Sequence, residues 1–276
     1  TILKRIANAL ESRAGTGKAY KPADWGIATA WLWQSHSLSL KPIENTGALP
    51  LDLLVGLESQ AETLLENTKA FSNGYAANNA LLWGARGTGK SSLVNAIHNK
   101  LDDDPKYPLH IIEIFREDLS TLPRLLDVLR SEPDIRFILF CDDLSFDEND
   151  SSYKSLKAVL EGGISGRPEN VIIYATSNRR HLLPRNMIEN ERSTAIHKSE
   201  SVEEKVSLSD RFGLWLGFYN IDQTAYLEMV HGYAKHYNLT VNEKDALEWA
   251  ITRGNRSGRV AWQYINQVAG QQGKIL

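Results

Sequence analysis

The sequence has 276 residues, a length typical of one or two domains. Hydrophobic residues make up 42% of it and charged residues 24%, which are ordinary globular values and exclude a disordered chain. The net charge of −3 argues against a generic basic coat for nucleic acid, and a single cysteine excludes an internal disulfide and a multi-cysteine zinc site. No apolar run approaches a membrane span and no signal-peptide pattern is present, so we expect a cytoplasmic globular protein.

The first fifty residues carry helical rather than strand patterns. Apolar residues recur at three- and four-residue spacings over 2–10 and 25–33. Two prolines and a glycine then indicate a linker: Pro42, Gly47 and Pro50. We therefore predict a helical N-terminal extension and linker over residues 1–50. Its tryptophans are expected to dock it onto the next domain, with a partner-binding surface as the alternative: Trp25, Trp31 and Trp33.

After this linker the pattern changes to alternating strands and helices. The strand candidates are compact apolar runs of the kind that a parallel sheet buries on both faces: 80–83, 109–115, 137–141 and 171–176. The helix candidates between them are 91–101, 122–130 and 153–161. The last part of the chain has helical patterns alone, at about 222–237, 242–253 and 257–267. We predict an α/β domain with an open parallel sheet flanked by helices over residues 51–218, then a small all-helical domain over 219–276.

A glycine-rich segment follows the first predicted strand and opens the first predicted helix. It fits G-x-x-x-x-G-K-[ST] at every fixed position, in the context that the motif requires. Its glycines let backbone N–H groups turn around an anion, which the helix N-terminus also favours. We expect Lys90 to reach the β- and γ-phosphates of a nucleotide and Ser91 to ligate Mg²⁺. The expected nucleotide-binding residues are Gly84, Ala85, Arg86, Gly87, Thr88, Gly89, Lys90, Ser91 and Ser92.

The strand at 137–141 ends in two carboxylates. A carboxylate at the carboxyl end of such a strand lies beside the phosphate loop, so Asp142 is the candidate for holding Mg²⁺. Asp143 is the candidate that polarises an attacking water. The alternative is that both belong to a solvated acidic turn over 142–150. Cys141 is expected to be a small buried core residue rather than a nucleophile.

Three further polar residues complete the candidate site. Asn178 follows the strand at 171–176, where an amide can orient a water against the γ-phosphate. Arg211 and Arg259 are candidates for stabilising the charge that phosphoryl transfer spreads over the γ-oxygens. Because a single arginine is usually a surface charge, the order and spacing of the motifs must support this assignment.

That order resembles the AAA+ ATPase superfamily. Several phrases are similar to one bacterial family of predicted ATPases, domain of unknown function 815, from about residue 24 to about residue 263: GARGTGKSSL, FCDDLSF, SSYKSLKAVLEGG, YATSNRRHLLP and VEEKVSLSDRFGLWLGFY. The resemblance implies that Asn178 is sensor 1, Arg211 the arginine finger and Arg259 the sensor 2 arginine of the lid helix. Arg256 competes for the last role, but the glycine before Arg259 favours the latter.

The resemblance also covers the adenine site and includes one departure. The segment 54–60, with Val55 and Gly56, is similar to the one that covers the adenine in the superfamily. Most AAA+ members have Glu where this chain has Asp143, whose side chain is one methylene shorter. DnaA-type initiators resemble the chain in having two Asp at this place, so the resemblance still implies ATP hydrolysis, with slow turnover expected.

These patterns together favour a Mg²⁺-dependent ATPase that acts as an oligomeric motor or switch. We expect ATP at subunit interfaces, an unknown protein or nucleic-acid client, and no membrane association. Two alternatives stay open, a nucleotide-gated loader with little hydrolysis and a monomeric P-loop kinase. A GTPase is disfavoured because the guanine motif at 99–102 falls inside the first helix. The basic cluster over 179–185 is either a solvated loop or a contact for DNA, a neighbouring subunit or an acidic client.

Overall fold

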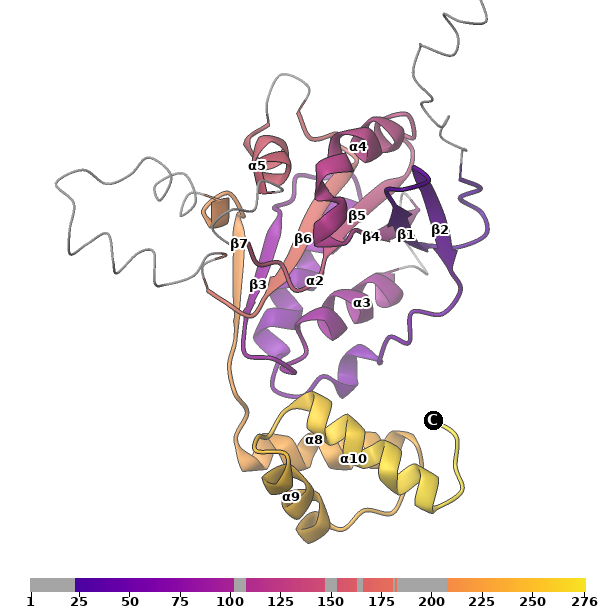
Figure 1. The fold of residues 1–276 in the computed structure, drawn as a ribbon. Coiled ribbons are helices and arrows are strands. Elements are labelled where there is room, and N and C mark those ends of the chain that lie inside the picture. Colours follow the sequence, from indigo (N-terminus) through magenta and orange to yellow (C-terminus); the bar gives the residue numbers. More distant parts are fainter. Residues whose placement is uncertain (1–22, 102–107, 147–152, 163–165, 181, 183–207) are drawn as a thin grey trace, which may run out of the picture.

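A seven-stranded sheet forms the centre of the protein in a computed structural model (Figure 1). The structure describes residues 23–101, 108–146, 153–162, 166–180, 182 and 208–276. The strand order is β2-β1-β4-β5-β6-β3-β7, and all neighbours are parallel except β1 and β2. The strands are β1 Ala30–Gln34, β2 Ser39–Ile43, β3 Ala80–Gly84, β4 Leu109–Glu113, β5 Arg136–Cys141, β6 Val171–Ser177 and β7 Leu214–Phe218.

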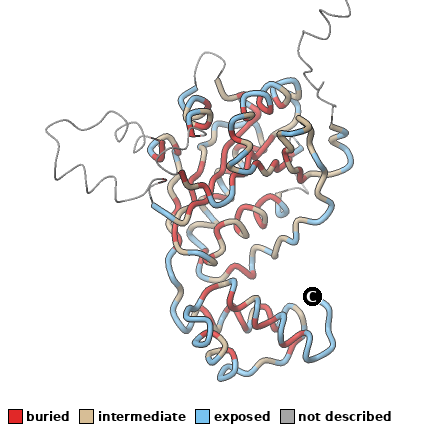
Figure 2. The backbone as a smooth tube through the Cα atoms, in the orientation of Figure 1, coloured by how far each residue is buried: buried red, intermediate tan, exposed pale blue. Residues whose placement is uncertain are grey.

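Helices cover both faces of this sheet, and the alternation of β5 shows how. Phe137 and Leu139 point into a core with helices α4 (Leu122–Arg130) and α5 (Tyr153–Glu161). Ile138 and Phe140 point to the opposite face, against α2 (Glu58–Ser72) and α3 (Lys90–Leu101). Two short 3₁₀ helices, η1 (Leu51–Leu53) and η2 (Arg116–Thr121), complete the described domain. Figure 2 shows the central strands as the most continuously buried part of the chain, which explains their near-uninterrupted apolar sequences.

The predicted strands and helices of the α/β domain are present, with ends shifted by a few residues. Strands β3 to β6 correspond to the four predicted strands, and α3, α4 and α5 to the three predicted helices. Neither β7 nor α2 was predicted as an element. Cys141 is buried, as expected, and burial raises the pKa of its thiol to about 12, so it is not a reactive thiolate.

The prediction of a helical segment over 25–33 is wrong. This part of the chain contains β1 and β2, an antiparallel hairpin whose first strand pairs in parallel with β4. The hairpin therefore extends the sheet, and the predicted boundary at residue 50 divides one sheet. The expected role of the tryptophans is confirmed in the docked hairpin. Trp31 and Trp33 are buried in the core and Trp25 packs against it. The predicted helix over 2–10 lies outside the described residues.

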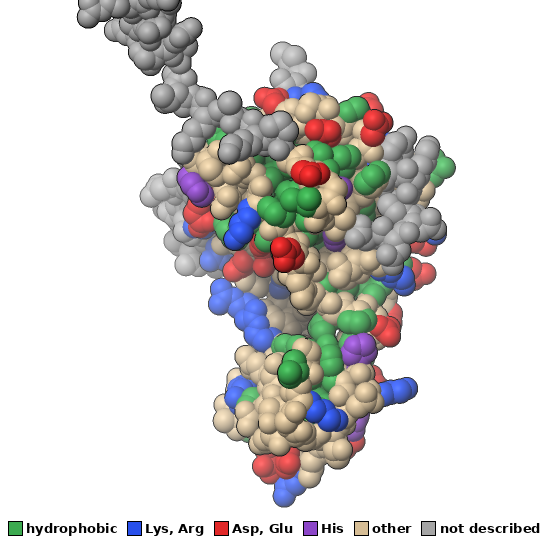
Figure 3. All heavy atoms as spheres, turned by 90° about the vertical axis from the view of Figure 1, so that its right-hand side faces the viewer, with side chains coloured by type: hydrophobic (Ala, Val, Ile, Leu, Met, Phe, Trp, Pro, Cys, Tyr) green, Lys and Arg blue, Asp and Glu red, His purple; other side chains and the backbone are tan. Residues whose placement is uncertain are grey.

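Three helices form a separate lobe after β7: α8 (Gln223–His236), α9 (Glu243–Thr252) and α10 (Gly258–Gln271). They share a core that also includes Leu53 of η1, and polar side chains cap their N-termini. Figure 3 shows this lobe, hereafter the lid, joined to the α/β domain at a narrower waist. Within the described residues, no helix combines the length and apolar character needed to cross a membrane.

Candidate nucleotide-binding site

The glycine-rich loop joins β3 to α3 and takes a conformation that its glycines permit. Gly84, Gly87 and Gly89 have φ values of 142°, 76° and 92°. A Cβ atom at Gly84 would lie 1.9 Å from the carbonyl oxygen of Phe218 on β7, so no larger residue fits there. Because α3 begins at Lys90, the free backbone N–H groups of its first turn lie directly after the loop. This arrangement is suited to holding an anion.

The Lys90 side chain points into the loop and is largely buried. Its Nζ donates to the carbonyl oxygens of Gly84 (2.9 Å) and Ala85 (2.6 Å) and to Asn178 Oδ1 (3.3 Å). Desolvation lowers the pKa of this amine, while the nearby carboxylates of Asp142 and Asp143 oppose the change. The structure thus brings sequence-distant Lys90 and Asn178 into direct contact.

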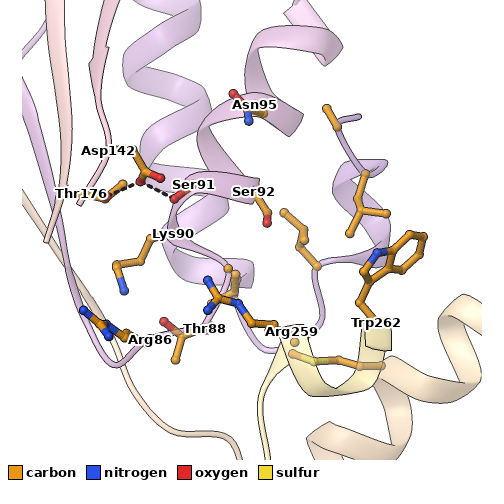
Figure 4. A pocket seen from close by; sticks show the side chains of 18 of the residues that line it. Arg86, Thr88, Lys90, Ser91, Ser92, Asn95, Asp142, Thr176, Arg259 and Trp262 are labelled. Atoms are coloured by element: carbon orange, nitrogen blue, oxygen red, sulfur yellow. Dashed lines mark hydrogen bonds between the residues drawn. The ribbon is translucent and has the colours of Figure 1, made fainter. Parts of the chain in front are cut away.

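A compact set of oxygen atoms lies beside the start of α3, and Figure 4 shows its two hydrogen bonds. Ser91 Oγ and Thr176 Oγ1 both donate to Asp142 Oδ1 at 2.5 Å. Thr176 Oγ1 in turn accepts the backbone N–H of Asp143 at 2.8 Å. Carboxylate and hydroxyl oxygens are the ligands that Mg²⁺ prefers, so Ser91 and Asp142 fit the metal that the sequence predicts. Thr176 was not predicted, although its position before Asn178 at the end of a strand was visible.

Asp143 lies next to this set in a left-handed backbone conformation, with φ at 49°. Its Oδ1 accepts a hydrogen bond from Asn178 Nδ2, and its Oδ2 lies 4.0 Å from Arg86 Nη2. The predicted base and the predicted sensor residue are therefore in contact. Positive φ is uncommon for residues other than glycine, although aspartate adopts it more often than most.

The lid reaches the loop through the start of α10. The backbone N–H of Arg259 donates to the carbonyl oxygen of Gly87 at 3.3 Å, and Ser257 caps the helix by accepting from the N–H of Val260. Arg259 lines the cavity, whereas Arg256 is exposed and does not. Of the two competing arginines, the structure places Arg259 at the loop.

A cavity of about 660 Å³ lies between the α/β domain and the lid. The loop and its polar partners form one end, and apolar side chains contribute to the rest: Leu49, Leu54, Leu57, Met229, Tyr233 and Trp262. Such a combination is typical of small-molecule sites. Val55 and Gly56 were predicted to cover the base but do not line the cavity, whereas their neighbours Leu54 and Leu57 do. The lid residues Met229, Tyr233 and Trp262 were missed.

Arg211 lies away from this cavity. It pairs with Glu161 at the end of α5, and it is not among the cavity-lining residues of its own chain. The structure therefore gathers Lys90, Asp142, Asp143, Asn178 and Arg259 at one site but not Arg211. Arg179 and Arg180 are described, and Arg180 stacks over the Trp83 ring at 5.2 Å, while the rest of the basic cluster over 179–185 lies largely outside the described residues.

The sequence matches a known family over residues 27–272, and that family is described as a protein of unknown function, DUF815. The chain belongs to this family. No curated protein matches the sequence. The description of the family assigns no activity.

Three solved structures illustrate the likeness. The Holliday junction branch migration motor RuvB of Thermotoga maritima has a TM-score of 0.51 at 19% identity, over 79% of this chain and 63% of RuvB. The ORC1 protein of Aeropyrum pernix, in complex with DNA, has a TM-score of 0.57 at 15% identity, over 81% of this chain and 65% of the ORC1 chain. Domain III of the Thermotoga maritima replication initiation protein DnaA has a TM-score of 0.51 at 16% identity, over 82% of this chain and 91% of the DnaA domain. The chain thus spans less than two thirds of the RuvB and ORC1 chains. At these identities the likeness shows the fold, which is that of the AAA+ P-loop NTPases.

Proposed function

We propose that the protein binds ATP with Mg²⁺ and hydrolyses it, as a nucleotide-driven oligomeric motor or switch acting on a macromolecular client. The observation that carries this proposal is the contact network at one end of the cavity. Lys90 bonds Asn178, Asn178 bonds Asp143, and Ser91 bonds Asp142, although these residues come from three separate parts of the chain. An adjacent lysine, metal-ligand pair, base and amide are the groups that phosphoryl transfer to water requires.

Each residue has a definite task in this reaction. The loop N–H groups and Lys90 bind the phosphates, and Ser91 and Asp142 hold Mg²⁺, which would neutralise developing phosphate charge when bound. Asp143 accepts a proton from the attacking water, and Asn178 orients that water through its amide. The apolar part of the cavity, including Leu54 and Trp262, encloses the base. Arg259 adds positive charge from the lid, so lid position responds to the nucleotide.

In this proposal, Arg211 acts at the nucleotide site of a neighbouring subunit. It pairs with Glu161 and does not line the cavity of its own chain. In a homo-oligomer with nucleotide at the interface, Arg211 of one subunit would add a guanidinium to the neighbour's site. The client is a protein or nucleic acid. Two of the structures with a similar fold support a nucleic-acid client, because ORC1 was solved in complex with DNA and RuvB is a Holliday junction branch migration motor.

One observation favours a second candidate, a nucleotide-gated loader that hydrolyses little. Asp143 is shorter than the glutamate usual at its position, and both of its oxygens face other groups, Asn178 and Arg86. A loader would bind ATP tightly and turn it over slowly. Turnover that is slow in the wild type and unchanged by removing the Asp143 carboxylate would favour it over the motor.

The direct test is nucleotide binding and hydrolysis by Lys90→Ala. Loss of the amine removes a charge-assisted contact to the phosphates, so affinity for Mg²⁺–ATP should fall at least about tenfold and turnover with it. Calorimetric titration and phosphate release measure the two effects. Lys69→Ala, on the exposed side of α2, is the matched control and should change neither. Equal binding by wild type and Lys90→Ala would contradict the proposal.

A further inference from the structure

Arg86 is the one charged side chain between the first and last glycines of the phosphate loop, and it lies at the Asp143 end of the cavity. Its Nη2 is 4.0 Å from Asp143 Oδ2, while Asn178 occupies the other carboxylate oxygen. Lys90 closes the chain of contacts by donating to Asn178 Oδ1. Arg86 and Lys90 therefore bracket the same pair of residues from two positions of one loop.

In the proposed nucleotide complex, this position corresponds to the terminal phosphate rather than to the inner ones. In such loops the backbone N–H groups serve the inner phosphates, and these contacts exist for ADP as well as for ATP. Asp143 and Asn178 are the residues proposed to act on the water beyond the γ-phosphate. A guanidinium beside Asp143 is therefore directed toward a group that only the triphosphate carries. Figure 4 shows Arg86 and Arg259 as two separate guanidinium groups at this end of the cavity, one from the loop and one from the lid.

The contact with Asp143 is of a kind that exchanges readily. The side chains of Arg86 and Asp143 are 76% and 57% exposed, and an ion pair this exposed is weak. Arginine binds phosphate oxygens in a bidentate fashion, which makes a phosphate with two negative charges the stronger competitor. Loss of its arginine would also leave the Asp143 carboxylate with Asn178 as its described hydrogen-bond partner and with one oxygen available to water.

We propose that Arg86 is a specificity-determining residue that exchanges Asp143 for the terminal phosphate and so distinguishes the triphosphate from the diphosphate. Before nucleotide binds, Arg86 covers one oxygen of the base. When the triphosphate is present, Arg86 pairs with its terminal phosphate and uncovers that oxygen. The inference rests on the proposed nucleotide site, but it assigns to the loop itself a role that is separate from those of Arg211 and Arg259.

The test compares the affinities of the full chain for Mg²⁺–ADP and for the Mg²⁺ complex of a non-hydrolysable β,γ-imido triphosphate, by calorimetry. Arg86→Ala should weaken the triphosphate analogue at least about tenfold and ADP by no more than about twofold. Arg86→Lys keeps the charge without the bidentate geometry and should fall between wild type and Arg86→Ala. Arg124→Ala, an exposed arginine of α4 that does not line the cavity, is the matched control and should change neither affinity.

The outcomes separate this inference from the proposed function. If Arg86→Ala weakens ADP and the triphosphate analogue equally, or weakens neither, the assignment of Arg86 is overturned while the nucleotide site stands. If the wild type binds neither nucleotide, both proposals are overturned. Thermal melting shows whether the variants fold. Because the Arg86 side chain is exposed, the melting temperature of Arg86→Ala should match that of Arg124→Ala. Arg86→Lys provides a second variant if Arg86→Ala does not fold.

Discussion

At the scale of single residues, Asp143 distinguishes a hydrolytic site from a binding site. It touches Asn178 through one oxygen and faces Arg86 with the other. An aspartate can accept a proton from water, whereas an asparagine of the same shape cannot. A variant at Asp143 therefore distinguishes the motor from the loader more sharply than a variant at Lys90, because both proposed functions need Lys90 for nucleotide binding.

We expect Asp143→Asn to retain nucleotide binding and to lower turnover by about a hundredfold or more, since general-base catalysis typically contributes a factor of that size. Calorimetry and steady-state phosphate release give the two numbers. Asp134→Asn, an exposed aspartate away from the cavity, should behave as wild type. Turnover in Asp143→Asn equal to that of the wild type would support the loader and contradict the motor.

The residues that the sequence indicated and those that it missed differ in how they reach the site. Lys90 and Ser91 are placed by the loop and the first turn of α3, so their motif contains the geometry. Asn178 could be predicted from the sequence because the carboxyl ends of parallel strands meet at one edge of a sheet. Met229 and Trp262 reach the cavity through the packing of the lid against the domain, and no local pattern encodes that contact. Their apolar spacing indicated only a helical core.

At the scale of elements, the N-terminal hairpin shows where periodicity misleads. The tryptophans of β1 alternate as in a strand, at 31 and 33, but this run is only five residues long and a helical spacing fits it too. Long-range contacts decide the matter. Trp33 Nε1 donates to Thr121 Oγ1 at 2.8 Å, and Trp31 Nε1 donates to His110 Nδ1 at 3.1 Å on neighbouring β4. β1, which the sequence analysis placed outside the α/β domain, thus pairs along the side of β4 within its sheet.

The contact between Trp31 and His110 makes this part of the sheet sensitive to pH. An indole N–H is only a donor, so His110 Nδ1 must be unprotonated to accept it. Burial, with a smaller effect from nearby His98, lowers the pKa of His110 from 6.5 to about 4. Between these values the unfolded chain binds a proton that the folded chain does not, so the free energy of unfolding falls as the pH falls.

Between about pH 7.5 and about pH 5, this one group should lower the free energy of unfolding by about 2 kcal/mol. Urea unfolding at the two pH values measures it. His110→Asn should show a correspondingly smaller loss, because the group that titrates is gone. His236→Asn, an exposed histidine at the end of α8, is the control for replacing a histidine as such. The same loss in wild type and His110→Asn would contradict the assignment.

At the scale of the whole molecule, the positions of the lid and of Arg211 bear on the proposed assembly. The cavity is lined by both lobes, and the Arg259 backbone is bonded to the loop. The described chain therefore brings together a loop, a metal-ligand pair, a base and a lid arginine, while Arg211 stays with Glu161 outside the cavity. A second copy that placed its Arg211 at this cavity would complete the set of groups. The sequence indicated this division only through the family resemblance, because no local pattern says on which subunit an arginine acts.

Mixing of inactive variants tests this arrangement directly. Lys90→Ala and Arg211→Ala subunits should each have less than about a tenth of wild-type turnover, because each lacks a group that is proposed to contact the phosphates. When they are mixed, some interfaces combine an intact Lys90 site with an intact Arg211 from the neighbour, so activity should return.

Lys90→Ala mixed with Asp143→Asn is the matched control. Both of these defects lie in the same cavity, but each subunit keeps its own Arg211, so no mixed interface regains a complete site and activity should stay low. Restored activity in the first mixture and not in the second requires Arg211 to act across the interface. An inactive first mixture, together with a wild type that stays monomeric in sizing experiments with ATP, would place Arg211 outside the reaction.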